Sequence, residues 1–302
     1  MEDTSVRGAG DKRFQVLIII ILTILALCAV VPFILLLSSS LTDDTTLMKF
    51  GYNFFPRKFS AYAYEYLFST NGENVFRAYG ITILITVVGT VLSLLIAPML
   101  AFPLSRRDYK RARLFTFLIF FTMLFNGGIV PAYLMWTTTF HIKNTIWALI
   151  LPNYLCTAFN IFLVRNYYSN SIPDALIEAA QIDGAGELTI FFRIIMPLAV
   201  PTIATISLFT ALTYWNDWVN ALYYIQKPQY YGIQNLLIRI MNNIQFLKSG
   251  AASVAVGAGA ITLPSNAVRM SMAVIGILPI VIIYPFVQKY FVKGVVVGAV
   301  KG

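Results

Sequence analysis

Acidic side chains, glycines and prolines gather in one stretch of this chain, residues 172–201, between long apolar runs. The stretch reads IPDALIEAAQIDGAGELTIFFRIIMPLAVP. Pro173 and Asp174 are typical of a helix start, because proline presets φ and an acid complements the positive end of the helix dipole. Glycines in Asp183-Gly184-Ala185-Gly186 tolerate the backbone angles of a sharp turn. The stretch therefore predicts two short helices around a glycine turn, at 174–182 and 187–196.

Two interpretations of this stretch are physically open. The first is an amphipathic helix pair at a membrane surface, whose charges are simply solvated. The second is a docking element, in which small alanines let a partner protein come close and carboxylates make charge-assisted contacts. The residues that the docking interpretation uses are Glu178, Ala179, Ala180, Asp183, Gly184, Ala185 and Pro197.

The rest of the chain lacks the residue sets of common enzymes. No G-x-x-x-x-G-K-[ST] phosphate loop occurs, so we expect no ATP binding by this chain itself. The one histidine, His141, has no nucleophile or acid partner nearby in the sequence. One histidine and two cysteines, Cys28 and Cys156, offer no credible metal site or disulfide framework. We predict a protein without catalytic residues, metal or cofactor of its own.

The elements that position the acidic stretch are indicated by composition. Of the 302 residues, 58% are hydrophobic and 12% are charged, which is far more apolar than a soluble domain. A helix needs about 20 apolar residues to span the hydrocarbon core. We therefore predict an all-α integral membrane protein with six transmembrane helices: Phe14–Leu37, Ala78–Phe102, Ala112–Trp136, Asn144–Val164, Leu198–Leu222 and Met272–Phe291.

The net charge of +9 is explained better by membrane topology than by nucleic acid binding. Six spans place both termini on one side, and the short basic cluster Arg106–Arg113 marks that side as cytoplasmic under the positive-inside rule. We predict a cytoplasmic tail at 1–13 and an extracellular segment at 38–77. The glycine-rich run at 250–262 is too short for a confident span, and we expect it in an extracellular loop.

Small residues mark one face of the second span. Gly89, Ser93 and Ala97 recur at four-residue spacing, so this face should pack closely against other helices inside the bundle.

Two spans carry groups that could line a solute path. Asn126-Gly127-Gly128 interrupts the third span, and such a break needs protein or a water-filled cavity beside it. Asp217 is the only acid in any predicted span. A plain kink and a structural carboxylate remain the favoured interpretations, while a substrate path is the alternative. The candidates for that path are Asn126, Gly128, Tyr133, Trp215, Asn216 and Asp217.

The acidic stretch resembles the EAA loop of ABC importer permeases, through Glu-Ala-Ala at 178–180, Asp-Gly-Ala at 183–185 and Phe192, Ile194 and Pro197. The string FFTMLFNGGIVPAYLMW is similar to permeases of the carbohydrate-uptake class, especially the LplC/YtcP-type branch. The closing Gly-Ala-Val-Lys-Gly resembles the tail of MalG-like permeases. The resemblance covers almost the whole chain from Phe54 onward.

The resemblance implies a type I ABC importer permease of the MetI-like fold. Its five-helix core would be 78–292, with a cytoplasmic coupling loop at 165–197 that docks on an ATPase. The tail at 293–302 would reach the ATPase through Lys293, Gly298 and Lys301. ATP and Mg would bind to the partner ATPase. Further expected partners are a second homologous permease in a heterodimer, a second ATPase copy, a solute-binding protein and the lipid bilayer.

The implied function is import of a carbohydrate across a bacterial cell membrane. The implied substrate is an oligosaccharide, and the LplC/YtcP-type branch favours one that contains uronic acids. The alternative from another class is a self-contained channel or facilitator for a small polar solute. Co-purification separates the two, since the importer needs an ATPase bound through 172–197 and a facilitator conducts alone.

Overall fold

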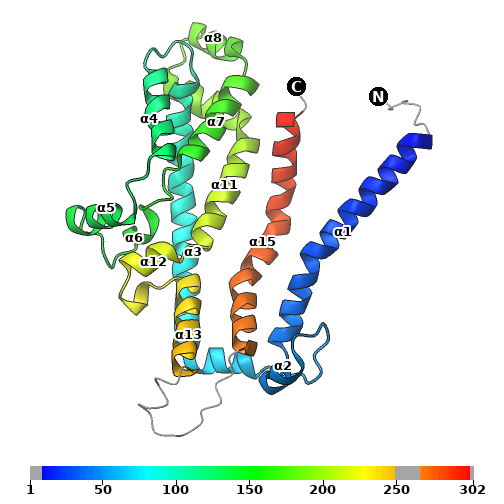
Figure 1. The fold of residues 1–302 in the computed structure, drawn as a ribbon. Coiled ribbons are helices and arrows are strands. Elements are labelled where there is room, and N and C mark those ends of the chain that lie inside the picture. Colours follow the sequence, from blue (N-terminus) through cyan, green and yellow to red (C-terminus); the bar gives the residue numbers. More distant parts are fainter. Residues whose placement is uncertain (1–8, 249–265, 300–302) are drawn as a thin grey trace. The chain divides into compact units, whose positions relative to one another are not determined.

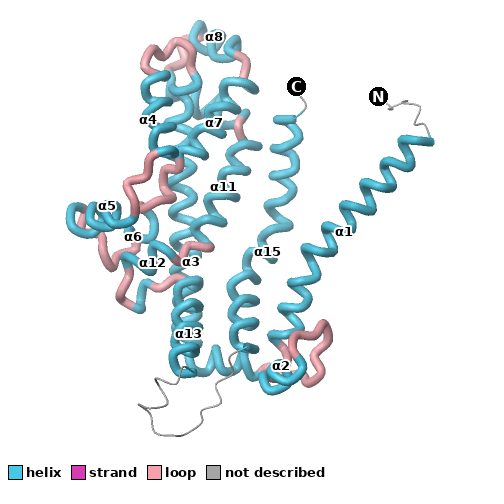
Figure 2. The backbone as a smooth tube through the Cα atoms, viewed as in Figure 1, coloured by secondary structure: helices cyan, strands magenta, loops and turns pink. Residues whose placement is uncertain are grey.

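A computed structural model describes residues 9–248 and 266–299. This part of the chain is almost entirely helical (Figure 2), and its one β contact is a bridge between Thr42 and Phe59. The chain forms two compact units, Met1–Gly72 with Met241–Ile277, and Glu73–Ile240 with Leu278–Gly302. The expected all-α architecture is confirmed.

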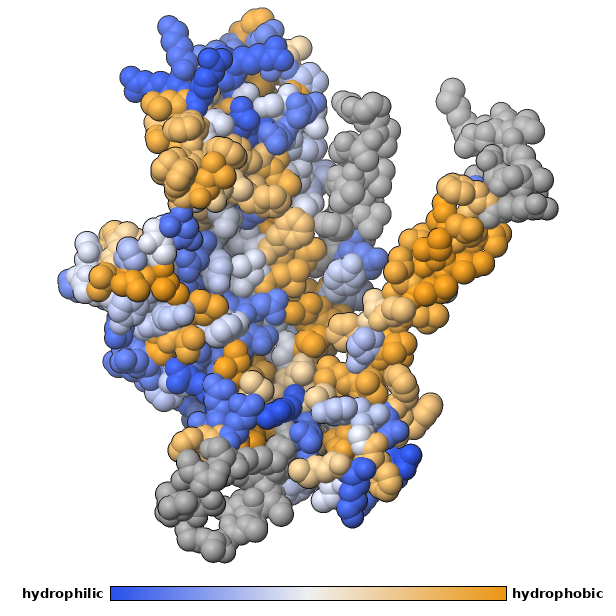
Figure 3. All heavy atoms as spheres, viewed as in Figure 1, coloured by the Kyte–Doolittle hydropathy of each residue, from blue (hydrophilic) through white to orange (hydrophobic). Residues whose placement is uncertain are grey.

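The first unit contains α1 (Ala9–Ser40), α2 (Asp44–Phe50) and the first turns of α3 and α15. No residue from Phe14 to Leu37 of α1 is buried in the chain itself, and Figure 3 shows hydrophobic atoms over the visible surface of this helix. A helix that is hydrophobic all round fits a lipid environment. Asp44 ties α2 to α15, because its Oδ1 accepts hydrogen bonds from the backbone N–H groups of Asn266 (3.0 Å) and Ala267 (3.1 Å).

The second unit holds most of the long helix α3 (Tyr62–Ser105), which lies alongside α7 and α11 in Figure 1. Ser93 and Ala97 of α3 are buried, and a Cβ added to Gly89 would lie 2.4 Å from the ring of Tyr214 in α11. The small-residue face predicted for this helix is therefore confirmed as a packing face. The other helices of this unit are α4 (Ala112–Leu124), α5 (Ile129–Leu134), η1 (Met135–Thr139), α6 (Trp147–Ile150), α7 (Ala158–Ser171), α8 (Asp174–Ile182), α9 (Glu187–Ile190), η2 (Phe191–Ile195), α10 (Met196–Leu198), α11 (Val200–Trp215), α12 (Val219–Tyr224) and η3 (Pro228–Tyr230).

Two further helices belong partly to each unit. Helix α13 (Ile233–Lys248) lies between the predicted fifth and sixth spans, and α15 (Asn266–Ala299) begins six residues before the predicted sixth span. Residues 293–299 of the predicted tail are also helical. The glycine-rich run at 250–262 lies outside the described residues.

The predicted spans need correction at their breaks. Within the described residues, three helices are long and apolar enough to cross a membrane, at Phe14–Ser40, Gly72–Ser105 and Asn266–Pro285. Two bent helix pairs raise the number to five if each pair is counted as one span: Ala112–Leu124 with Ile129–Thr139, at 111°, and Glu187–Leu198 with Val200–Trp215, at 80°.

The fourth predicted span, Asn144–Val164, is not one helix. Helix α6 ends at Ile150 and α7 begins at Ala158. Pro152 has no N–H group to continue the helix, and Asn153 has a positive φ of 70°. Apolar composition does not indicate this break, because the sequence is hydrophobic on both sides of it.

Candidate coupling surface and solute path

Helix α8 follows Pro173, as predicted, and Asp174 lies in its first turn. One face of the helix is anchored, since Ile177 and Ala180 are buried in a hydrophobic cluster with residues of α3 and α7. The opposite face is free: Glu178 and Ala179 are exposed. Ala180, which we expected on the docking face, instead packs inward, because it lies three residues from Ile177 on the same side of the helix.

The turn after α8 has the hydrogen bonds of a Schellman motif. The N–H of Gly184 donates to the carbonyl of Gln181 (3.0 Å), and the N–H of Ala185 donates to that of Ala180 (2.9 Å). Gly184 has φ of 81°, the left-handed conformation that glycine adopts at no steric cost. The predicted glycine turn is confirmed. It leaves Ile182 at 86% exposure and Asp183 exposed, while Ala185 is half-buried.

Pro197 lies farther along, in the short helix α10, and is exposed. The chain bends by 80° between Leu198 and Val200 before it enters α11. We refer to α8, the glycine turn and α9, residues 174–190, as the coupling surface. Pro197 thus belongs to the connection between the coupling surface and α11, and not to the face that carries Glu178.

The loop between α3 and α4 contacts both ends of this surface. Nη1 of Arg106 lies 3.6 Å from Oε2 of Glu187, and Nε of Arg107 lies 3.4 Å from Oδ2 of Asp174. Arg106 also donates two hydrogen bonds to the carboxylate of Asp108, from Nε (2.9 Å) and Nη2 (2.7 Å). These bonds raise the pKa of the Arg106 side chain and lower the pKa of Asp108.

These contacts are not predicted by the sequence. The charges of Arg106 and Arg107 are accounted for there by membrane topology alone, and Glu187 has no predicted role. The one available signal was that the basic cluster and the acidic stretch were both predicted to be cytoplasmic. Hydrophilic atoms gather over this end of the unit, around α8 and the α3–α4 loop, above a hydrophobic band over α4 (Figure 3).

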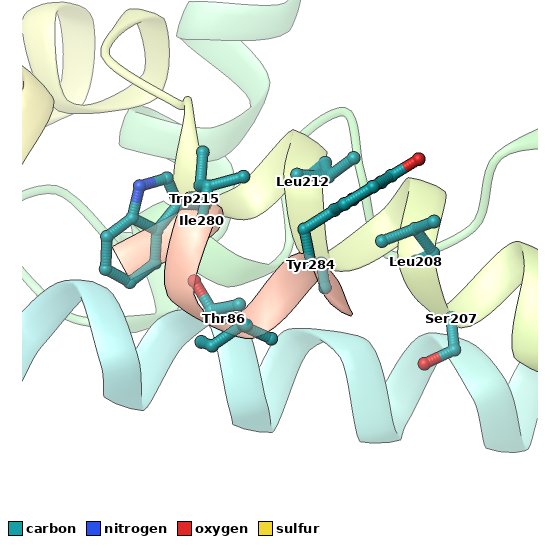
Figure 4. Close-up of a pocket in the computed structure, with 9 residues that line it drawn as sticks. Thr86, Ser207, Leu208, Leu212, Trp215, Ile280 and Tyr284 are labelled. Carbon is teal, nitrogen blue, oxygen red and sulfur yellow. The ribbon is translucent and has the colours of Figure 1, made fainter. Parts of the chain in front are cut away.

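Trp215, one of the candidates for a solute path, lines a cavity. This cavity has a volume of about 380 Å³ and lies among α3, α11 and α15 (Figure 4). Its walls are mostly apolar, with Thr86 and Ser207 as the aliphatic hydroxyl side chains. The other lining residues are Leu208, Ala211, Leu212, Ile280, Ile283 and Tyr284.

Asp217 makes the hydrogen bonds of a helix cap through one of its two carboxylate oxygens. Its side chain is buried, with 7% of the residue exposed. Oδ1 accepts hydrogen bonds from the N–H groups of Val219 (3.0 Å) and Asn220 (3.1 Å) and from the hydroxyl of Tyr154 (3.1 Å). Asp217 therefore caps α12. The neighbouring Asn216 is exposed and donates back to the carbonyl of Leu212 in its own helix.

The third-span candidates lie in separate surroundings. Oδ1 of Asn126 accepts a hydrogen bond from the N–H of Gly128, whose φ is 85°. Tyr133 stacks on Tyr224, with ring centroids 5.8 Å apart, and accepts a hydrogen bond from Lys143. Asn126 and Tyr133 therefore have different contacts in the described residues.

The expected tail contacts are only partly within the described residues. Lys293 and Gly298 fall on the last turns of α15, and Lys301 lies outside the described residues. Among the residues that the structure describes, no group of three or more His, Cys, Asp or Glu side chains could hold a metal ion.

These features define a class: a helical membrane protein with broken spans and a surface helix anchored at one end of the bundle. The family model "Binding-protein-dependent transport system inner membrane component" matches residues 67–297. The chain belongs to this family.

Similar proteins agree with this assignment. The chain is 36% identical to the polygalacturonan/rhamnogalacturonan transport system permease protein YtcP of Bacillus subtilis, over 97% of this chain and 99% of that protein. It is 35% identical to protein LplC of the same organism, over 97% and 96%. A solved bacterial ABC transporter that imports the acidic polysaccharide alginate contains a chain with TM-score 0.77 and 32% identity, covering 95% of this chain and 100% of that one.

Proposed function

We propose that this chain is a transmembrane permease subunit of an ABC importer that carries an oligosaccharide containing uronic acids into a bacterial cell. The observation that carries the proposal is the geometry of α8. A short helix has its inner face fixed in the hydrophobic cluster and its outer face, with Glu178 and Ala179, free to meet a partner. Membership of the transport family supports a partner that supplies energy.

The remaining subunits follow from the same proposal. Two ATPases bind ATP and Mg on the cytoplasmic side, and one of them docks on α8. A second, homologous permease completes the path, because one chain offers one coupling surface for a pair of ATPases. A solute-binding protein delivers the sugar on the outer side. The permease itself has no catalytic step, so its contribution is to couple movement of the ATPases to opening of the path.

The substrate class is supported by the similar proteins and not by the cavity. One relative is named for polygalacturonan transport, and the similar solved structure belongs to an importer of an acidic polysaccharide. The test is reconstitution of the complete complex in liposomes. We expect ATP-dependent uptake of labelled oligogalacturonate, and little uptake of a neutral oligosaccharide of equal length. Preference for the neutral sugar would overturn the substrate class, and uptake without ATP would favour the facilitator.

The docking role of α8 has its own test. Glu178→Lys reverses a charge on the exposed face, and loss of a charged contact whose partner stays buried costs about 2–5 kcal/mol. We expect this variant to insert and pair with the second permease but to lose the ATPase on purification, with loss of uptake. Asn170→Lys places a positive charge at an exposed position near the end of α7 and should leave both unchanged. Normal ATPase binding and uptake by Glu178→Lys would contradict the docking role.

A further inference from the structure

The two halves of the coupling surface are joined by one carboxylate. Glu187 begins α9, after the glycine turn, and its Oε1 accepts a hydrogen bond from Nε2 of Gln181 in α8, at 3.2 Å. Its other oxygen, Oε2, faces Nη1 of Arg106 at 3.6 Å. Glu187 thus links α8, α9 and the α3–α4 loop through a single side chain.

Arg106 is fixed on the side away from Glu187. Its side chain is 11% exposed and makes the two hydrogen bonds to Asp108 described above. Its guanidinium carbon lies 5.8 Å from the ring centroid of Phe102 at the end of α3. The Phe102 ring in turn lies 5.5 Å from the ring of Phe191, which follows α9. A planar guanidinium held in this way is a rigid reference point directly after the end of the long helix α3.

Nη1 of Arg106 is buried and makes no hydrogen bond in the described part of the chain. Its distance of 3.6 Å from the Glu187 carboxylate is longer than the 2.7–2.9 Å or so of a charge-assisted hydrogen bond. A small shift of α9 toward α3 would close that distance and satisfy the nitrogen. The contact is therefore sensitive to the position of α9 relative to α3.

We propose that Arg106 is a positioning residue, which holds the coupling surface at a fixed angle to α3 through Glu187, so that a push on α8 moves the transmembrane helix. This inference rests on the proposed function. The neighbouring pair, Arg107 with Asp174, has the same charges and an equally exposed carboxylate, 58% against 59% for Glu187. It differs in its arginine, because the Arg107 side chain is 88% exposed and that of Arg106 is 11% exposed. Such exposed pairs contribute little, so Arg107 serves as a matched control.

The test uses the complete transporter and measures the number of sugars imported per ATP hydrolysed. Arg106→Gln and Glu187→Gln should each lower this ratio roughly two- to fivefold, the size expected for one partly exposed ion pair, while the ATPase stays bound. In the double variant, the number of sugars imported per ATP should be no lower than in the single variant with the lower ratio, because both changes remove the same contact. Arg106→Lys should recover part of the ratio, and Arg107→Gln should match the wild type.

A second measurement does not depend on transport. Hydrogen exchange of the permease pair should be faster over residues 174–190 in Arg106→Gln, and unchanged over α7. An unchanged transport ratio in assembled Arg106→Gln, or unchanged exchange over 174–190, would overturn the positioning role. Loss of assembly in both single variants would assign the pair to folding and would also overturn it. A wild-type complex without ATP-driven uptake would instead refute the proposed function, and the exchange result would still decide the role of Arg106.

Discussion

Gly184 forms the turn between the two helices of the coupling surface. With φ of 81°, it ends α8 and permits the two hydrogen bonds of the Schellman turn. A Cβ added at Gly184 would meet nothing within 4 Å, so only the backbone conformation opposes a side chain there. Gly186 also has open space around it, but its φ is −71°. Both glycines have space for a side chain, but only at Gly184 would a side chain strain the backbone.

This difference gives a residue-scale prediction. Gly184→Ala should strain the turn by roughly 1 kcal/mol or more, and uptake per assembled complex should fall by about fivefold if that strain displaces α8. Gly186→Ala should leave uptake near the wild-type level. The measurement is ATP-dependent uptake normalised to the bound ATPase. Equal uptake by the two variants would show that the left-handed turn is not required.

Asp217, also at the residue scale, shows that an acid within a predicted span can cap a helix. An acid within a predicted span indicates a functional group by default. Here its buried oxygen satisfies two backbone donors at the start of α12 and the hydroxyl of Tyr154. A buried cap of this kind lowers the cost of ending one helix and starting another inside the bundle.

Helix α3 contacts α11 and leads into the loop that carries Arg106. Its small-residue face receives the ring of Tyr214, which is fully buried and donates a hydrogen bond to the carbonyl of Ile150 at 2.8 Å. Gly89 lets the ring come this close. Tyr214 therefore ties α11 to both α3 and α6. The end of α3 carries Phe102 and leads directly to Arg106.

The element-scale prediction concerns this packing. Gly89→Ala would place a Cβ 2.4 Å from the ring of Tyr214, and overpacking a buried contact costs about 1–3 kcal/mol. The midpoint of thermal unfolding in detergent should fall by several degrees, at roughly 2–4 °C per kcal/mol.

The matched control lies in the same helix. A Cβ at Gly80 would meet nothing within 4 Å, and alanine favours a helix over glycine by about 1 kcal/mol. Gly80→Ala should therefore keep or raise the midpoint. If both variants unfolded at the same temperature, close packing at Gly89 would not contribute to stability.

At the scale of the whole molecule, the membrane orientation connects the site to its partners. The apolar span Gly72–Ser105 contains 34 residues, which at 1.5 Å per residue is about 50 Å and more than enough to cross a bilayer. Glu73 and the α3–α4 loop therefore lie at opposite ends of one membrane-crossing helix. The coupling surface shares the side of that loop, because Arg106 and Arg107 contact it.

This arrangement predicts the accessibility of introduced cysteines. In a variant with Cys28 and Cys156 replaced by alanine, Glu73→Cys should react in intact cells with a membrane-impermeant thiol reagent. Lys110→Cys and Gly186→Cys should react only after the cells are opened, because the basic cluster is expected inside. Reaction of position 110 or 186 from outside would reverse the orientation and separate α8 from a cytoplasmic ATPase.

The sequence alone determined the local features. Apolar composition established the class of the protein, and Pro173, Asp174 and Gly184 located both ends of α8, because helix caps and left-handed turns are encoded by residues close together in the chain. The small-residue spacing of α3 identified its packing face for the same reason. The break at Pro152 was not predicted, since hydropathy does not change where a helix bends.

Only the tertiary structure decided which residues serve the surface and which serve the core. Ala179 and Ala180 are adjacent in an alanine pair, yet one is exposed and the other is buried against α3 and α7. The contact of Arg106 with Glu187 joins residues that are far apart in the sequence, and Asn126 and Tyr133 have different contacts. The physical reason is that burial and ion pairing depend on how distant helices meet, and no local pattern contains that information.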